Sequence, residues 1–112
     1  MAAANIAVLT IGIQATGAIT ANAAVTATGV QATAAGNAIG FANTAGAIGD
    51  RVPTTALGTA IATSGGVIAL GAALEVGTAG KLVTKAAGIA VARALTAATA
   101  ADQQIEVLVL PN

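Results

Sequence analysis

The chain of 112 residues contains no cysteine and no histidine. The lack of cysteine excludes disulfide bonds and thiol nucleophiles, and the lack of both residues removes the usual zinc ligands and the most common general base. The single serine, Ser64, precedes two glycines and has no histidine to activate it, so we interpret it as a turn residue. The four carboxylates are scattered singly along the sequence. We therefore expect a protein that is not an enzyme, with no catalytic residues and no cofactor or metal site.

Aromatic and charged residues are also scarce. Phe41 is the only aromatic residue, and charged residues make up 7% of the chain, against about 25% in an average domain. The net charge is zero and the pI is near 6.0, so we expect no binding to nucleic acid or to an anionic membrane. The mean hydropathy of +0.88 is high, but polar residues or glycine interrupt every long apolar run, which argues against a transmembrane helix.

The few charges are unevenly distributed. All of them lie between Asp50 and Glu106, so residues 1–49 carry none. A surface without charge has no electrostatic protection against association. Hydrophobic residues make up 56% of the chain, but most of them are alanine, which buries little surface per residue. We therefore expect identical subunits or a larger surface to supply part of the stabilisation.

The segment from Leu74 to Lys85 predicts a β-hairpin. Two alternating apolar runs flank Thr78-Ala79-Gly80, and a loop with Gly80 in the left-handed conformation pairs Val76 with Leu82. The same register pairs Leu74 with Thr84, and these four residues share one face. We expect the other face to point to solvent; it carries Glu75, Lys81, Val83 and Lys85.

Further short strands are predicted on both sides of the hairpin, at 6–14, 25–33, 38–42, 51–55 with 57–63 continuing extended, 89–95 and 104–110. Pro53 cannot donate to a ladder, so we expect its strand to lie at a sheet edge or to begin just after Pro53. In the run 89–95, the larger residues share one parity with Arg93, which lies near Glu106 if that run pairs with the last one in antiparallel fashion. In the run 104–110, Ile105, Val107 and Val109 share one face.

These patterns predict an all-β fold, a small antiparallel β-barrel or sandwich of short strands with an extended N-terminal segment. Alanine favours helix, but glycine recurs too often to leave a long helical window, and turn signals recur every 8 to 12 residues or so. We expect one domain over 1–112, with 1–36 as an uncharged contact region and 37–112 as the β core. Within Ala2 to Gln31, the candidate contact residues are Ile6, Val8, Leu9, Ile11, Ile13, Val25 and Val30.

Three stretches of the second half share a family pattern: 57–62, 68–84 and 91–110. The hairpin follows G-x-x-L-x-x-x-x-x-G-K-V, with Leu82 in place of the final valine. The ending is an alanine-rich run that leads into Ile105-Glu106-Val107-Leu108-Val109, where the family pattern has I-x-V-L-L. Together these stretches, within residues 50–112, resemble the capsid cement (head decoration) proteins of tailed bacteriophages. Arg93 stands near where that family often has Gly-x-Ala, and Ala101-Asp102 replaces its usual turn.

The resemblance implies a structural protein of a phage virion. Such a protein is made in the host cytoplasm, binds the outside of the head and stabilises contacts between subunits of the major capsid protein. The implied partners are the major capsid protein and the chain's own copies, with a trimer favoured over a dimer. An adhesive or ice-binding surface protein is the alternative, because Thr26-Ala27-Thr28 and other Ala-Thr pairs recur, although without a fixed period.

Overall fold

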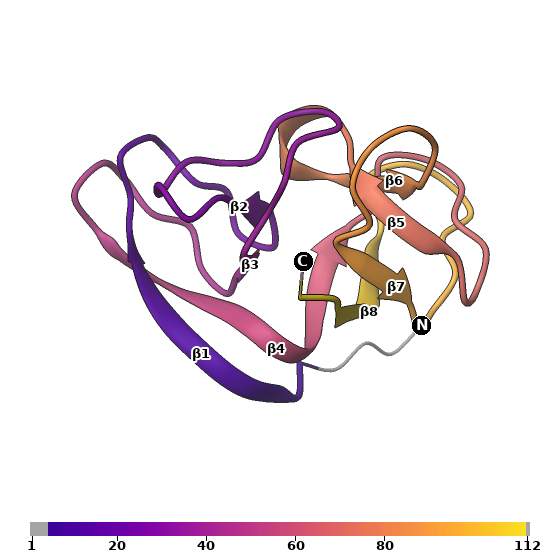
Figure 1. Ribbon diagram of the computed structural model, residues 1–112, viewed down its shortest axis with the longest axis horizontal. Coiled ribbons are helices and arrows are strands. Elements are labelled where there is room, and N and C mark those ends of the chain that lie inside the picture. Colours follow the sequence, from indigo (N-terminus) through magenta and orange to yellow (C-terminus); the bar gives the residue numbers. More distant parts are fainter. Residues whose placement is uncertain (1–4, 112) are drawn as a thin grey trace.

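The computed structural model describes residues 5–111, and these residues form an eight-stranded antiparallel sheet that curls into a nearly closed barrel (Figure 1). The all-β prediction of a small barrel or sandwich is confirmed. Within the described part of the chain, no helix is long and apolar enough to span a membrane. The elements are β1 (Ala7–Gln14), β2 (Ala24–Val25), β3 (Gly40–Ala42), β4 (Arg51–Thr63), β5 (Ala73–Val76), the short 3₁₀ helix η1 (Thr78–Gly80), β6 (Leu82–Thr84), β7 (Ala92–Ala94) and β8 (Gln104–Val109).

The long strand β4 joins the two halves of the molecule. Its first half pairs with β1 and β3, and its second half pairs with β8, after which the order runs β7, β5 and β6. The sheet curls back on itself because the Gly65 N–H, just after β4, donates to the Leu82 carbonyl on β6 at 2.7 Å. In Figure 1 β1 and β4 run side by side, with β2 and β3 above them near the centre of the view and β5 to β8 on the right. We call residues 5–56 the N-terminal lobe and the remainder the barrel.

The predicted hairpin register is confirmed. Leu74 pairs with Thr84 and Val76 with Leu82, and Gly80 has a left-handed φ of 73°. Leu74, Val76 and Leu82 are fully buried. On β8 the predicted inward face is also confirmed, since Ile105, Val107 and Val109 are buried.

In the run 89–95, the larger residues of shared parity do not all face the interior, because Val91 is buried but Ile89 is exposed. Ala92 and Ala94 of β7 are buried, whereas Arg93 and Leu95 are exposed. The reason is that β7 lies between β5 and β8, whose larger side chains already fill the barrel interior, so alanine fits there. Arg93 pairs with Leu108, which places it diagonally across from Glu106, and its Nη1 donates to the Gly71 carbonyl at 2.9 Å.

The predicted strand over 25–33 is wrong, because β2 ends at Val25. The Thr26 hydroxyl bonds the Thr28 hydroxyl at 3.0 Å and the Val30 carbonyl at 3.2 Å. Such local bonds favour a turn over a sheet ladder. Gly29, with a φ of 91°, closes the turn, and Gln31 returns to bridge Val25.

Both expectations for Pro53 are wrong as well, since β4 begins at Arg51 and has neighbours on both sides. The Pro53 carbonyl accepts the Asn43 N–H at 2.8 Å. In an antiparallel strand the nitrogen and carbonyl of one residue point to the same side, so the missing N–H of Pro53 faces away from β1. It lies beside Asn43, just past the end of β3, and the β1 ladder therefore loses no hydrogen bond.

Two clusters of buried residues form the core. The smaller cluster lies within the N-terminal lobe and consists of Ala15, Ile19, Val25, Ala42 and Val52. The larger fills the barrel, but it includes Phe41 from β3 and Ala24 from β2. Phe41 therefore packs the N-terminal lobe against the barrel. Its ring is the largest fully buried side chain in the described chain.

Candidate contact surface

The start of β1 exposes a group of large apolar side chains. Ile6 is 65% exposed, Val8 77% and Leu9 44%. Leu9 pairs with Leu57 of β4, which is also exposed. Within residues 5–111, β1 pairs only with β4, so this group lies at an open sheet edge. We call Ile6, Val8, Leu9 and Leu57 the edge patch.

The backbone explains why these side chains are exposed. The β1–β4 register shifts on both sides of Leu9, and such irregularities break the alternation that would place every second residue in the core. Gly58 makes this arrangement possible with a φ of 97°. A Cβ at Gly58 would lie 2.4 Å from the Ile6 carbonyl oxygen and 2.7 Å from the Val8 nitrogen. Only glycine lets the start of β1 approach β4 so closely.

The other predicted contact residues lie elsewhere. Ile11 and Ile13 are half-buried, and Ile13 packs against the smaller core. Val25 is fully buried in that core, so its assignment as a contact residue is wrong. Val30 is 37% exposed in the turn after β2. Two turns flank the end of β1, because the Thr16 N–H donates to Gly29 and the Gly49 N–H donates to Ala15.

The second of these turns carries Ile48, which is 74% exposed. We call Val30 and Ile48 the turn face. The Asp50 carboxylate accepts the Ala47 N–H at 2.9 Å, which fixes this turn. The Arg51 side chain donates to the Gly12 carbonyl at 3.1 Å and so occupies part of the open edge of β1. Charged side chains at such positions hinder pairing with further strands, so the unprotected part of the edge is its start, at the edge patch.

An apolar cleft of about 470 Å³ lies over the middle of β4, between the N-terminal lobe and the C-terminal end of the described chain. Its lining comes from four separate segments, which is why no sequence pattern predicts it. The residues that line it carry no charge; they are Thr26, Ala27, Asn37, Ala38, Ile39, Ala56, Leu110 and Pro111.

Most of the charged residues lie in the barrel. One of them, Glu75, does not have the exposure that the hairpin pattern predicts. Glu75, expected to face solvent, is only 7% exposed. Its carboxylate accepts the N–H of Ala86 and, at 3.2 Å, that of Gly88. A Cβ at Gly88 would lie 2.5 Å from the other carboxylate oxygen. Glu75 therefore anchors the loop between β6 and β7, and the alternation of β5 alone does not reveal this because the donors come from that loop.

Hydrogen bonds set the ionisation of Glu75. The N–H groups of Ala86 and Gly88 donate to the ionised carboxylate and lower its pKa below the ordinary value. Burial acts in the opposite direction, and the nearby Lys85 charge adds to the lowering. The net effect is a lowered pKa.

We therefore expect Glu75→Gln to lower the melting temperature at pH 7. The lowered pKa means that the ionised carboxylate stabilises the folded chain above the ordinary glutamate range. This contribution is lost as the pH falls below about 4.3 and through the lowered pKa. The difference in melting temperature between the wild type and Glu75→Gln should thus shrink on acidification, as thermal unfolding followed by circular dichroism would measure. Glu75→Asp, which keeps the charge but reaches less far, should also be less stable at pH 7. A difference that stays constant with pH would contradict this role.

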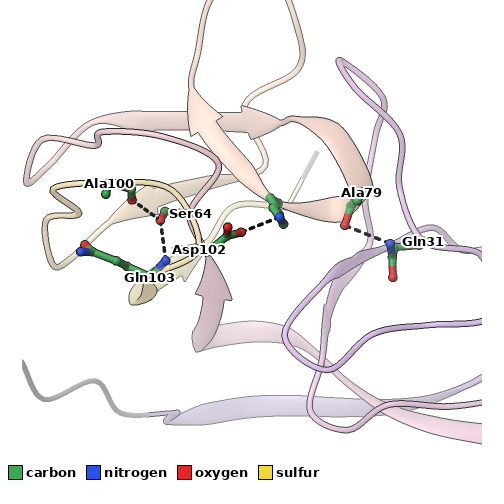
Figure 2. Close-up of polar contacts among 7 residues, drawn as sticks. Gln31, Ser64, Ala79, Ala100, Asp102 and Gln103 are labelled. Atoms are coloured by element: carbon green, nitrogen blue, oxygen red, sulfur yellow. Dashed lines mark hydrogen bonds and ion pairs between the residues drawn. The ribbon is translucent and has the colours of Figure 1, made fainter.

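The side chains of Ser64 and Gln31 make hydrogen bonds between segments that lie far apart in the sequence (Figure 2). The Ser64 hydroxyl donates to the Ala100 carbonyl at 2.8 Å and accepts the Gln103 N–H at 3.0 Å, so Ser64 is a buried structural residue at the end of β4. The Gln31 amide donates to the Ala79 carbonyl at 2.9 Å and joins the N-terminal lobe to the hairpin loop. Lys81, expected to face solvent, pairs with Asp102 at 2.5 Å. Both partners of that pair are more than one-third exposed, so it contributes little to stability.

No family model, curated protein or solved structure matches the chain. Among residues 5–111, no three acidic side chains are grouped so that they could hold a metal ion. The surfaces that stand out are therefore the edge patch, the turn face and the cleft. All residues of the edge patch and the turn face except Leu57 lie before Asp50, in the stretch of the sequence that has no charge.

Proposed function

We propose that the chain is a capsid cement protein, which binds the outside of a tailed-phage head and stabilises contacts between major capsid protein subunits. The observation that carries the proposal is the N-terminal lobe, where large apolar side chains are exposed and no residue before Asp50 is charged. Exposed apolar side chains that lie next to each other, as Leu9 and Leu57 do, are typical of surfaces that bind other proteins. The resemblance of residues 50–112 to the cement family supports the same function.

The mechanism is the addition of buried surface across a subunit boundary. Burying an exposed aliphatic side chain such as Ile48 stabilises a contact by roughly 1.5–3 kcal/mol. A ligand that binds only the assembled state shifts the equilibrium away from separated subunits. Binding of several linked copies, with a trimer favoured, multiplies weak contacts through avidity. The charged barrel end, with Lys85 and Arg93, would face solvent on the outer surface of the virion.

The experiment is co-sedimentation of the full chain with assembled heads made from the major capsid protein that the same genome encodes. Wild type should pellet with the heads and raise their disassembly temperature. Ile48→Lys places a charge on the turn face and should weaken head binding at least about tenfold, which corresponds to about 1.4 kcal/mol. Val67→Lys is the matched control, because Val67 lies on the barrel and is 72% exposed, against 74% for Ile48.

Two results would contradict the proposal. One is the absence of wild type from the head pellet, and the other is an equal loss of binding in both lysine variants. Thermal hysteresis activity without head binding would favour the ice-binding alternative. That function needs a flat, regular threonine array, whereas Thr26 and Thr28 bond each other within a turn and Thr54 and Thr55 are buried.

A further inference from the structure

The described part of the chain carries two uncharged, mainly apolar features, the edge patch and the cleft. In the edge patch, Ile6 and Val8 are 65% and 77% exposed. The cleft is concave and has a volume of about 470 Å³, which accommodates more than one aliphatic side chain. We propose that the edge patch of one copy inserts into the cleft of a second copy. This contact names the self-association that the proposed function requires, and it leaves the turn face free for the head.

Charge favours a second copy over another partner. The edge patch and the residues that line the cleft carry no charge. An average protein surface is far richer in charge, and burying an unpaired charge is costly. A second copy brings only uncharged, mostly aliphatic groups to both sides of the contact. Arg51, the charged residue bonded to β1, lies at Gly12, beyond the edge patch.

The contact joins two different surfaces, so it is heterologous. Heterologous contacts close into rings when the rotation between copies allows it, which agrees with the expected trimer. Standard specific interfaces bury about 1,200–2,000 Å², and the edge patch consists of only four side chains, so the oligomer should dissociate on dilution.

Light scattering after size-exclusion chromatography tests the contact without any capsid. Detection must use refractive index, because the chain has no tryptophan or tyrosine. Wild type should have a mass above the 10.4 kDa of one copy that falls on dilution. Val8→Lys in the edge patch and Ile39→Lys in the cleft should each raise the dissociation constant at least about tenfold. Val67→Lys, at a site on the barrel that is 72% exposed, should behave as wild type.

Mixing the two variants gives a sharper test. The intact edge patch of Ile39→Lys can enter the intact cleft of Val8→Lys, so the mixture should associate where each variant alone is a monomer. If the edge patch instead met its own copy, or the cleft met its own copy, mixing would not restore an intact contact. Far-UV circular dichroism and urea unfolding establish that each variant is folded before mixing.

Three results would overturn the inference: a monomeric wild type at several hundred micromolar, equal weakening by Val67→Lys, or folded variants that fail to complement. Head binding separates this inference from the proposed function. A monomeric wild type that binds heads leaves the proposed function standing and removes the self-contact. A wild type that self-associates but does not bind heads supports the self-contact and contradicts the proposed function.

Discussion

Replacing Phe41 by alanine should lower the free energy of unfolding by about 3–5 kcal/mol, the usual cost of removing a buried aromatic ring. Phe41 is 1% exposed and belongs to the larger core, although its strand β3 lies in the N-terminal lobe. Seven of the sixteen buried residues of that core are alanine, whose short side chains cannot fill the space that the ring leaves. Domains are stable by only about 5–15 kcal/mol, and this variant should therefore be close to unfolding at room temperature.

Urea unfolding followed by far-UV circular dichroism measures this effect, because the chain has no tryptophan or tyrosine for fluorescence. Phe41→Leu keeps most of the volume and should lose clearly less stability than Phe41→Ala. Val67→Ala removes an exposed side chain and should change the free energy by less than about 0.5 kcal/mol. A Phe41→Ala variant as stable as Val67→Ala would show that the ring does not join the N-terminal lobe to the barrel.

The sequence predicts best the parts of the fold that short-range alternation determines. The β5–β6 register follows from the apolar runs on either side of Gly80, and a slip by one residue would expose Leu74 and Leu82. The inward face of β8 follows from the same period of two. Of the contact candidates chosen from the uncharged stretch before Asp50, Ile6 and Val8 are exposed, whereas Val25 is buried.

The features that the sequence does not predict depend on contacts between residues far apart in the chain. The orientation of β7 depends on its neighbours β5 and β8, which leave room only for Ala92 and Ala94. Glu75 is buried because a loop eleven and more residues away supplies its donors. Alternation in β1 predicts neither the bulge that exposes the edge patch nor the cleft, whose lining includes both Thr26 and Pro111. Gly58 is the one local signal, since a glycine inside a strand often marks a bulge.

Gly29→Ala should destabilise the N-terminal lobe by about 2–5 kcal/mol, through backbone strain and a direct clash. Gly29 has a φ of 91°, which costs a residue with a side chain roughly 1–2 kcal/mol. In addition, a Cβ at Gly29 would lie 2.0 Å from the Gln14 carbonyl oxygen and 3.2 Å from the Thr16 nitrogen. The turn after β2 would have to move away from the end of β1, and the bond from the Thr16 N–H to the Gly29 carbonyl would be lost.

Alanine variants of two other glycines separate backbone strain from the direct clash when their free energies of unfolding are also measured in urea. Gly49 has a similar φ of 94° but no atom within 4 Å of an added Cβ, so Gly49→Ala should cost only the strain of about 1–2 kcal/mol. Gly66 has neither the positive φ nor a neighbour within 4 Å, so Gly66→Ala should change stability by less than about 1 kcal/mol. The expected order of destabilisation is Gly29, Gly49, Gly66. Equal losses at Gly29 and Gly49 would mean that the turn after β2 does not pack against the end of β1, and the turn face would then lack the fixed geometry that head binding requires.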